Sequence, residues 1–323
     1  MLRFGIIGTN FISEWFIAAA RRTNGRVVPA AVCSRDLARG QDFARRQGID
    51  QAFDDLTAMA EVVDAVYVAS PNAFHHEQAL VAIEAGRHVL VEKTMATSAA
   101  QVREIFAAAQ SRGVVAMEAM RNLHAPAHSM VRDLLPHLGV VRQARIEKLQ
   151  YSSRYDRFRA GKYMNAFDPA LGNSALADIG VYCLHPALDL FGMPKDTTGT
   201  SLLLDNGFEG AGSMTWGYDG LVVDLSWSKI TRGVNPSVIY GEDAALTLDD
   251  VGETSVITLR PRGGEPEVLY DVPTAAPDNM HHELVDFADQ VDAGATDPRW
   301  SQLSVWTRDL MDAHLARVFG GQS

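Results

Sequence analysis

Three side chains of this sequence have the chemistry needed to move a proton at a hydroxyl group: Lys93, Asp178 and Tyr182. Asp178 and Tyr182 are four residues apart in a segment with helical patterning, so both should lie on one face of that helix. Tyrosine, with an ordinary pKa of about 10, is a poor base at neutral pH, and a neighbouring ammonium group favours its phenolate form. We therefore expect Tyr182 to transfer the proton, Lys93 to hold the hydroxyl and tune Tyr182, and Asp178 to orient the substrate or Lys93.

Each of these residues also has a purely structural interpretation. A tyrosine within a helix is usually a packed core residue, and an aspartate near a helix start is stabilised by the helix dipole. Lys93 alone would pass for a surface charge, whereas its position after an apolar run favours a ligand site. His185, which precedes Pro186, is expected to be structural.

The segment around Lys93 predicts a ligand site at the edge of a sheet. An apolar run ends in the turn Ser70-Pro71-Asn72, a helical pattern follows, and a second apolar run ends in Glu92 and Lys93. Strand, helix and strand without room for a hairpin predict a parallel pair. Because open parallel sheets bind ligands beyond the carboxyl ends of their strands, Asn72, Glu92 and Lys93 should lie beside a bound ligand.

A second candidate site follows the first predicted strand. Dinucleotide-binding loops have the pattern Gly-x-Gly-x-x-Gly, and this chain has Gly-x-Asn-x-x-Ser from Gly8. Gly8 provides the tight turn, Asn10 stands where the backbone approaches the pyrophosphate, and Ser13 is small enough for close packing. Asparagine tolerates a left-handed backbone better than other non-glycine residues, so we expect the turn to survive with Asn10 in that conformation. The alternative is an ordinary turn between a strand and a helix.

The end of the second predicted strand bears on the choice of cofactor. An acidic residue there binds the ribose 2′-hydroxyl of NAD, whereas an arginine accommodates the 2′-phosphate of NADP. Ser34 and Arg35 occupy that place, so we expect NADP(H), with NAD as the alternative. Asp36 is expected to cap the next helix. The alternative for Arg35 is a solvated surface charge.

The elements that must position these residues form two groups, of which the first occupies the first third of the chain. Apolar runs alternate there with helical patterns, which predicts a doubly wound α/β parallel sheet with right-handed crossovers. The strands are expected at residues 3–7, 27–33, 65–69, 88–91 and 114–117, and the helices at 12–22, 37–47, 74–85 and 99–109.

The pattern changes near Arg121, which is therefore expected to face the ligand. We place the border there, between a dinucleotide-binding domain (1–121) and an α+β domain for substrate binding and dimerisation (122–323). Short strands separated by Gly and Asp turns predict a large, mostly antiparallel open sheet. Its strands are expected at residues 143–152, 201–204, 211–216, 221–227, 237–240, 245–248, 255–259 and 267–270, and the helices at 127–138, 175–191, 280–293 and 303–318.

A polar, basic segment at residues 153–173 has two interpretations. It could cover the cofactor or bind an anionic substrate, but runs of charge are more often solvated, which we favour. Its charged and aromatic side chains are Arg154, Tyr155, Arg157, Arg159, Lys162 and Tyr163.

Composition limits the class of protein. The 323 residues include 40 acidic and 29 basic side chains, and a formal charge of −11 argues against nucleic acid as the main partner. No apolar run approaches the roughly 18 residues of a membrane span, and no signal-peptide pattern precedes the first strand. Two distant cysteines, Cys33 and Cys183, make a disulfide framework implausible, so we expect a cytoplasmic protein. The histidines show no zinc-type grouping with cysteine, so no metal is predicted.

Taken together, these segments resemble the glucose–fructose oxidoreductase/inositol dehydrogenase (Gfo/Idh/MocA) family over nearly the whole chain. The sequence around Tyr182 is most similar to the branch with glucose–fructose oxidoreductase and dihydrodiol dehydrogenase, where tyrosine replaces the more common histidine. The resemblance depends on Gly8-Thr9-Asn10, the turn at residues 70–75, Glu92-Lys93, residues 177–182 (Ala-Asp-Ile-Gly-Val-Tyr) and residues 240–244 (Tyr-Gly-Glu-Asp-Ala).

The resemblance implies a Rossmann-type domain that binds NAD(P), and a sugar, polyol or diol bound against the sheet of the second domain. The outer face of that sheet commonly forms a dimer in the family, so a homodimer or homotetramer is implied. The expected cofactor-binding residues are Gly8, Thr9, Asn10, Phe11, Ile12, Ser34, Arg35, Ser70, Pro71, Asn72, His75, Glu92, Lys93 and Arg121.

One departure from the family pattern concerns Lys93, because the family's Glu-Lys-Pro is here Glu92-Lys93-Thr94. A Lys–Thr peptide bond strongly prefers the trans form.

The leading function is an NADP(H)-dependent oxidoreductase acting on a carbohydrate or diol. The alternatives are a non-catalytic dinucleotide sensor and a hydrolase that uses a tightly bound nicotinamide transiently. Retention of Lys93, Asp178 and Tyr182 argues against the sensor.

Overall fold

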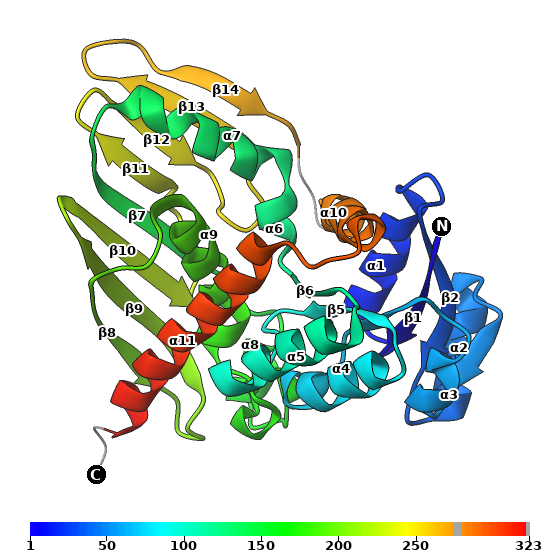
Figure 1. Ribbon diagram of the computed structural model, residues 1–323. Coiled ribbons are helices and arrows are strands. Elements are labelled where there is room, and N and C mark those ends of the chain that lie inside the picture. The colour runs from blue at the N-terminus through cyan, green and yellow to red at the C-terminus, as the bar shows by residue number, and fades with distance from the viewer. Residues whose placement is uncertain (274–278, 321–323) are drawn as a thin grey trace. The chain divides into compact units, whose positions relative to one another are not determined.

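The computed structural model describes residues 1–273 and 279–320, and the chain divides into two compact units (Figure 1). The first unit comprises Met1–Arg121 and Ala276–Val305, and the second comprises Asn122–Ala275 and Trp306–Ser323. Residues 276–305, which the sequence analysis assigned to the second domain, therefore return to the first unit. Helical periodicity does not reveal which sheet a helix packs against, so this return has no local signal.

The first unit is built on a six-stranded parallel sheet with the order β3-β2-β1-β4-β5-β6. The strand order reverses between β1 and β4, and open α/β sheets bind ligands at such a point. The strands are β1 (Leu2–Ile7), β2 (Val27–Cys33), β3 (Gln51–Phe53), β4 (Ala65–Val68), β5 (His88–Glu92) and β6 (Ala116–Ala119), and the helices are α1 (Phe11–Arg21), α2 (Leu37–Gln47), α3 (Leu56–Ala60), α4 (His75–Glu84), α5 (Ala99–Arg112) and α10 (Met280–Ala293).

Successive side chains of β4 point to opposite faces of the sheet, and helices cover both faces. Val66 and Val68 belong to a buried apolar cluster with side chains of α3, α4 and α5. Tyr67, between them, stacks on Phe16 of α1 with ring centroids 4.1 Å apart. Phe287 of α10 packs 5.5 Å from Phe4 of β1, so α10 completes the core of the first unit.

The second unit is built on an eight-stranded sheet with the order β14-β13-β12-β11-β7-β10-β9-β8. Among the described strand pairs of this sheet, β7 and β10 are parallel and the others antiparallel. The strands are β7 (Val141–Leu149), β8 (Asp196–Leu203), β9 (Glu209–Tyr218), β10 (Leu221–Ser228), β11 (Ser237–Gly241), β12 (Ala244–Leu248), β13 (Val256–Pro261) and β14 (Glu267–Asp271), and the helices are α6 (Arg121–His124), α7 (Pro126–Leu134), α8 (Tyr155–Arg159), α9 (Val181–Phe191) and α11 (Pro298–Gly320).

Two tryptophans form the centre of the second unit. Trp216 of β9 and Trp227 of β10 are 0% and 1% exposed, and both belong to the sheet face that packs against helices. His314 of α11 lies edge-on to Trp227 at 5.5 Å, and its Nε2 lies 2.9 Å from Ser201 Oγ on β8. The last helix thereby fastens the β8 edge to the core.

Each strand and helix that the sequence predicts is present, most of them with shifted ends. The short elements β3, α3 and α8 were not predicted because three to five residues carry too little periodicity. The helix expected at 175–191 opens with a π-helical stretch, Leu176–Gly180, before α9 begins. The helix expected at 127–138 is α7 followed by a 3-10 turn, Leu135–Leu138.

Candidate active site

Gly8 makes the tight turn that the sequence analysis assigned to it. Its φ is +108°, and a Cβ atom there would lie 2.8 Å from the carbonyl oxygen of Ala69. Ser13 Oγ donates a hydrogen bond to the Gly8 carbonyl at 3.0 Å. The loop between β1 and α1 thus approaches the end of β4 too closely for any side chain at position 8.

Asn10 supports this loop in a way that differs from the prediction. Its Oδ1 accepts hydrogen bonds from the Ile12 and Ser13 N–H groups at 3.0 and 3.3 Å, and its Nδ2 donates to the Ala69 carbonyl at 2.8 Å. The expected left-handed backbone is wrong, because φ is −100°. An asparagine that caps a helix needs an extended backbone to turn its side chain onto the helix N–H groups.

The end of β2 presents a cation where a dinucleotide's ribose is expected. Ser34 is half-buried and Arg35 is exposed, with the Arg35 guanidinium carbon 5.5 Å from the ring centroid of Phe74. Asp36 caps α2 by accepting a hydrogen bond from the Arg39 N–H at 3.1 Å, which confirms that prediction. Neither position 34 nor position 35 offers a carboxylate for a free 2′-hydroxyl, so this strand end suits a phosphate.

His75 fastens two loops at the same sheet edge. Its Nε2 lies 2.8 Å from the Ser70 carbonyl oxygen and its Nδ1 lies 3.0 Å from the Thr94 carbonyl oxygen. Burial lowers the pKa of His75, although both backbone contacts favour the charged form. The ring therefore ties the turn of Ser70, Pro71 and Asn72 to the residues after β5, and its nitrogens serve the backbone.

Glu92 and Arg121 lie in a buried polar network. The Tyr67 hydroxyl donates a hydrogen bond to Glu92, and Arg121 Nη1 donates to Asn279 Oδ1 at 2.7 Å. Burial raises the pKa of Glu92, opposed by the Tyr67 bond and the charge of Arg121. Glu283 of α10 is 1% exposed, and within the described part of the chain neither of its carboxylate oxygens has a hydrogen-bond partner. Burial, followed by the charge of Glu92, raises its pKa well above the ordinary value.

Lys93 is half-buried and follows β5 directly. The Lys93–Thr94 peptide bond is cis, although a Lys–Thr bond ordinarily prefers the trans form. Hydrogen bonds hold both sides of the bond: the Lys93 N–H donates to Glu92 Oε2 at 3.3 Å, and the Met95 N–H donates to Glu118 Oε1 at 2.8 Å. The backbone around Lys93 is therefore fixed by two buried glutamates.

In the second unit, Asp178 belongs to the π-helical stretch that precedes α9. Glu209 of β9 lies beneath this stretch, where it accepts hydrogen bonds from the Leu176 N–H at 2.7 Å and from Trp227 Nε1 at 2.8 Å. Burial raises the pKa of Glu209. At Gly180 a Cβ atom would lie 3.0 Å from the Trp227 ring, so the helix packs directly on that ring. π-Helical turns occur frequently at functional sites.

Tyr182 is half-buried in the first turn of α9, four residues after Asp178. Pro186 lies four residues further on and has no N–H to donate to the Tyr182 carbonyl. Asp178 Oδ2 lies 2.8 Å from Lys229 Nζ, and the Asp178 side chain is 36% exposed. Lys229 carried no sequence signal, because a single lysine after a strand is indistinguishable from a surface charge.

The predicted catalytic residues belong to different units. Lys93 lies in the first unit, with the residues expected to bind the cofactor, and Asp178 and Tyr182 lie in the second. The structure pairs Asp178 with Lys229 and joins the Lys93 N–H to Glu92.

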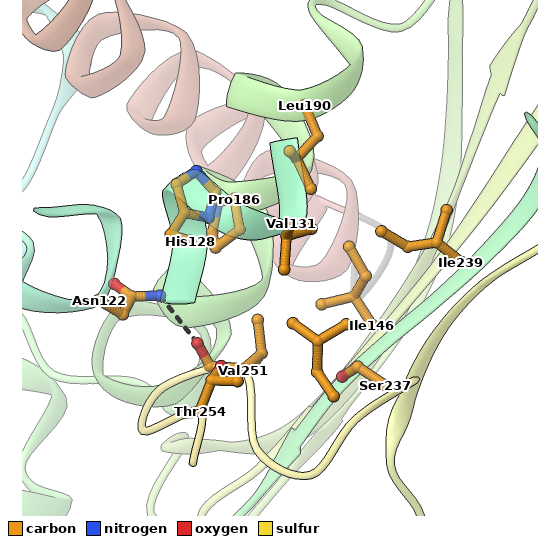
Figure 2. Close-up of a pocket in the computed structure, with 11 residues that line it drawn as sticks. Asn122, His128, Val131, Ile146, Pro186, Leu190, Ser237, Ile239, Val251 and Thr254 are labelled. Carbon is orange, nitrogen blue, oxygen red and sulfur yellow. Dashed lines mark hydrogen bonds between the residues drawn. The ribbon is translucent and has the colours of Figure 1, made fainter. Parts of the chain in front are cut away.

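A pocket of about 20 Å³ in the second unit contains none of the predicted catalytic residues among those lining it (Figure 2). It lies where α7 and α9 pack on the sheet, and His128 beside it pairs with Asp189 at 2.7 Å. This volume accommodates about one water molecule, so we assign it to core packing. Its lining residues are Asn122, His128, Val131, Ile146, Pro186, Leu190, Ser237, Ile239, Leu248, Val251 and Thr254.

The basic segment at residues 153–173 has a charged outer side and an aromatic inner side. Arg157, Arg159 and Lys162 are exposed, whereas Phe158 stacks on buried Phe167 with centroids 4.9 Å apart. This arrangement matches the favoured interpretation of a solvated charge run.

Over the described residues, no helix is long and apolar enough to cross a membrane. Among the same residues, no group of three or more His, Cys, Asp or Glu side chains is placed to hold a metal ion.

Comparison with known proteins gives matches in both units. The model of the "Oxidoreductase family, NAD-binding Rossmann fold" matches residues 2–120, and that of the "GFO/IDH/MocA C-terminal domain" matches residues 137–247. The scyllo-inositol 2-dehydrogenase (NADP(+)) IolU of Bacillus subtilis is 40% identical over 289 residues, which cover 89% of this chain and 87% of that protein.

Two further comparisons extend this picture. Human trans-1,2-dihydrobenzene-1,2-diol dehydrogenase is 33% identical over 201 residues, covering 60% of this chain and 57% of that protein. The crystal structure of KijD10, a 3-ketoreductase from Actinomadura kijaniata in complex with NADP and TDP-benzene, is 25% identical, with a TM-score of 0.85 and 98% and 97% of the two chains covered.

Proposed function

Because the chain belongs to the Gfo/Idh/MocA family of oxidoreductases, we propose that it transfers a hydride between NADP(H) and the CH–OH carbon of a sugar, polyol or diol. The observation that carries this proposal is the identity with the NADP(+)-dependent scyllo-inositol dehydrogenase over 89% of the chain. The relative's name gives a cyclic polyol as its substrate, so a cyclic polyol is the first substrate to test.

The residues of the first unit fit a dinucleotide. Gly8 provides the close approach between the loop and β4, and exposed Arg35 offers a cation to a 2′-phosphate. The N-terminus of α1 stands at the point where the strand order reverses. NADP⁺, when bound, supplies the acceptor for the hydride that leaves the substrate carbon.

We assign three roles to the chain's own side chains in alcohol oxidation. Lys93 donates a hydrogen bond to the reacting hydroxyl oxygen, and Tyr182, acting in its phenolate form, accepts the hydroxyl proton as the carbonyl forms. Asp178 accepts a hydrogen bond from the substrate and orients it. In the reverse direction Tyr182 returns the proton to the carbonyl oxygen.

Two measurements test this function. Purified protein is titrated with NADPH and NADH by nicotinamide fluorescence, and initial rates with NADP⁺ are then measured for scyllo-inositol, trans-1,2-dihydrobenzene-1,2-diol and glucose. We expect tighter binding of NADPH and reduction of NADP⁺ by at least one polyol or diol. Binding without turnover would favour a dinucleotide sensor. A cofactor retained through purification with no net redox change would favour the hydrolase alternative.

We also propose a homodimer or homotetramer that forms through the open face of the eight-stranded sheet. Val222 of β10 and Tyr240 of β11 flank Gln143 of β7 in one row, and they are 43% and 38% exposed. They lie opposite the buried face of Val223 and Ile239. Light scattering of the native protein and of Tyr240→Glu should show loss of the oligomer in the variant.

A cytoplasmic location completes the proposal. Cys33 and Cys183 are both free and buried, and burial raises the pKa of the Cys33 thiol to about 11. Buried, unpaired thiols are typical of proteins in reducing compartments.

A further inference from the structure

Lys229, which directly follows β10, places its ammonium group in the interior of the second unit. Its side chain is 6% exposed, whereas the side chain of Asp178, 2.8 Å away, is 36% exposed. A buried ammonium is costly unless it is paired and hydrogen-bonded. One end of this ion pair is therefore sealed from water, and the other end stays accessible on the helix that carries Tyr182.

The ammonium end of the Lys229 side chain is held by several further contacts. Nζ also donates to the Ala166 carbonyl at 2.7 Å and lies 5.2 Å from the Phe167 ring centroid and 5.5 Å from that of Phe208. The aromatic faces favour a cation at this place. The ammonium position is thus set by a carboxylate, a carbonyl and two rings.

The Lys229 backbone is equally fixed. Its N–H donates to the Gly210 carbonyl at 3.0 Å, and its carbonyl accepts from the Ser152 N–H at 3.0 Å. Lys229 therefore extends from a rigid strand end to Asp178 and to Ala166, which belongs to the basic segment. One side chain connects the sheet, the basic segment and the start of the helix.

We propose that Lys229 is a positioning residue that aims the Asp178 carboxylate at the substrate and ties the basic segment to it through the Ala166 carbonyl. The inference deepens the proposed function and depends on it for the role of Asp178. Because Lys229 acts on the substrate through Asp178, its effect on turnover disappears when Asp178 no longer carries a carboxylate.

Steady-state kinetics of a double-mutant cycle test the first part. With the polyol that the native enzyme oxidises fastest, Lys229→Met should lower kcat at least ~10-fold, as expected for a misplaced group, with KM for NADP⁺ unchanged. Lys229→Arg, which keeps the charge, should recover most of kcat. In the Asp178→Asn background, adding Lys229→Met should change kcat by less than about twofold. The double variant leaves no unpaired buried charge, so it also covers a failure of Lys229→Met to fold.

Lys148→Met is the matched control, because Lys148 forms a half-buried ion pair with Asp250 at 2.6 Å in the same unit. It should lower thermal stability and leave kcat unchanged. Equal kcat losses in both lysine variants, or a full Lys229→Met effect in the Asp178→Asn background, would overturn the positioning role.

Limited proteolysis tests the second part without any turnover. Trypsin should cut the folded Lys229→Met variant after Arg157, Arg159 or Lys162 at least about threefold faster than the wild type. Without the bond from Lys229 to Ala166, opening of the basic segment requires less free energy. Lys148→Met should be cut at the wild-type rate. Unchanged cleavage in Lys229→Met would overturn the anchoring. If the wild type oxidises no polyol, the proposed function fails and the proteolysis still decides whether Lys229 holds the segment.

Discussion

Arg35 is the single side chain on which the selection of NADPH over NADH should depend. A charge-assisted hydrogen bond to phosphate contributes about 1.5–3 kcal/mol, so Arg35→Ala should weaken NADPH binding roughly 10- to 100-fold. NADH binding should not change, because NADH lacks the 2′-phosphate. Fluorescence titration with both nucleotides measures the effect, and Arg45→Ala, which replaces an exposed arginine of the helix α2 that follows Arg35, is the control. Equal losses for NADPH and NADH in Arg35→Ala would contradict the assignment.

Lys93 and Tyr182 carry the second prediction. Lys93→Met and Tyr182→Phe should each lower kcat at least ~10²-fold, the usual contribution of a group that positions or transfers a proton. NADPH affinity should stay within about twofold of the wild type in Tyr182→Phe, because the substitution removes only a hydroxyl oxygen. Rapid-mixing kinetics with the best polyol would show whether the hydride-transfer step is slowed. Near-normal turnover in both variants would refute the assigned roles.

Single residues could be predicted where a local pattern surrounds them, and not elsewhere. Gly8 and Asp36 follow strand ends, and the structure confirms the tight turn predicted for Gly8 and the helix cap predicted for Asp36. Lys229 and Glu283 were missed because their partners are distant in sequence: Lys229 pairs with Asp178, and Glu283 lies near Glu92. A lone charged residue in an otherwise ordinary strand or helix gives no sign of what it meets after folding.

Helix α1 depends on one side chain, Asn10, for the cap at its N-terminus. Asn10 caps it through two hydrogen bonds and adds a third to the Ala69 carbonyl. Asn10→Ala should lower the free energy of unfolding by about 1–2 kcal/mol, the cost of a lost cap. Thermal and urea unfolding would measure it, with Ser98→Ala as comparison, since Ser98 caps α5 through one hydrogen bond. An Asn10→Ala variant as stable as the wild type would show that water replaces the cap.

Periodicity predicted long elements well and their irregular parts poorly. The bounds of β2, α2 and α10 agree with the sequence analysis residue for residue. The π-helical stretch before α9 was not foreseen, because it arises where Glu209 of a distant strand accepts the helix N–H groups. The same holds for Asn10, whose conformation depends on Ala69, 59 residues away. Local propensity describes an element, and long-range hydrogen bonds set its ends.

At the scale of the whole molecule, buried Glu283 should make stability depend on pH. Its folded pKa is raised above the ordinary 4.5, so the folded state keeps a proton that the unfolded state releases. The contribution of Glu283 to the free energy of unfolding is therefore greatest below pH 4.5. It declines as pH rises toward the folded pKa, by up to about 1.4 kcal/mol per pH unit. Glu283→Gln should remove this decline, so its melting temperature should exceed that of the wild type more at pH 8 than at pH 5.5.

Calorimetry at the two pH values would measure the Glu283 effect. Glu84→Gln is the control, because Glu84 is an exposed glutamate of the same unit. A constant difference between Glu283→Gln and the wild type at both pH values would mean that Glu283 is charged in the folded protein. The carboxylate would then need a compensating cation that outweighs its burial.

The division into two sheets followed from the change in pattern near Arg121, but the path of the chain did not. α10 supplies Phe287 to the core around Phe4, and α11 begins in the first unit and ends in the second. Such returns depend on which apolar faces meet, and a single sequence does not state which faces pair.

This interleaved path determines how the protein can be taken apart. A fragment that stops at Arg121 lacks α10 and leaves Phe4 without Phe287, so it should expose apolar surface and aggregate. An exchange of the nucleotide-binding half with a relative must carry two separate stretches of chain, joined at three crossing points. The first unit therefore cannot be transferred as one continuous segment. Recombination between relatives should yield folded chimaeras only when both stretches come from the same parent.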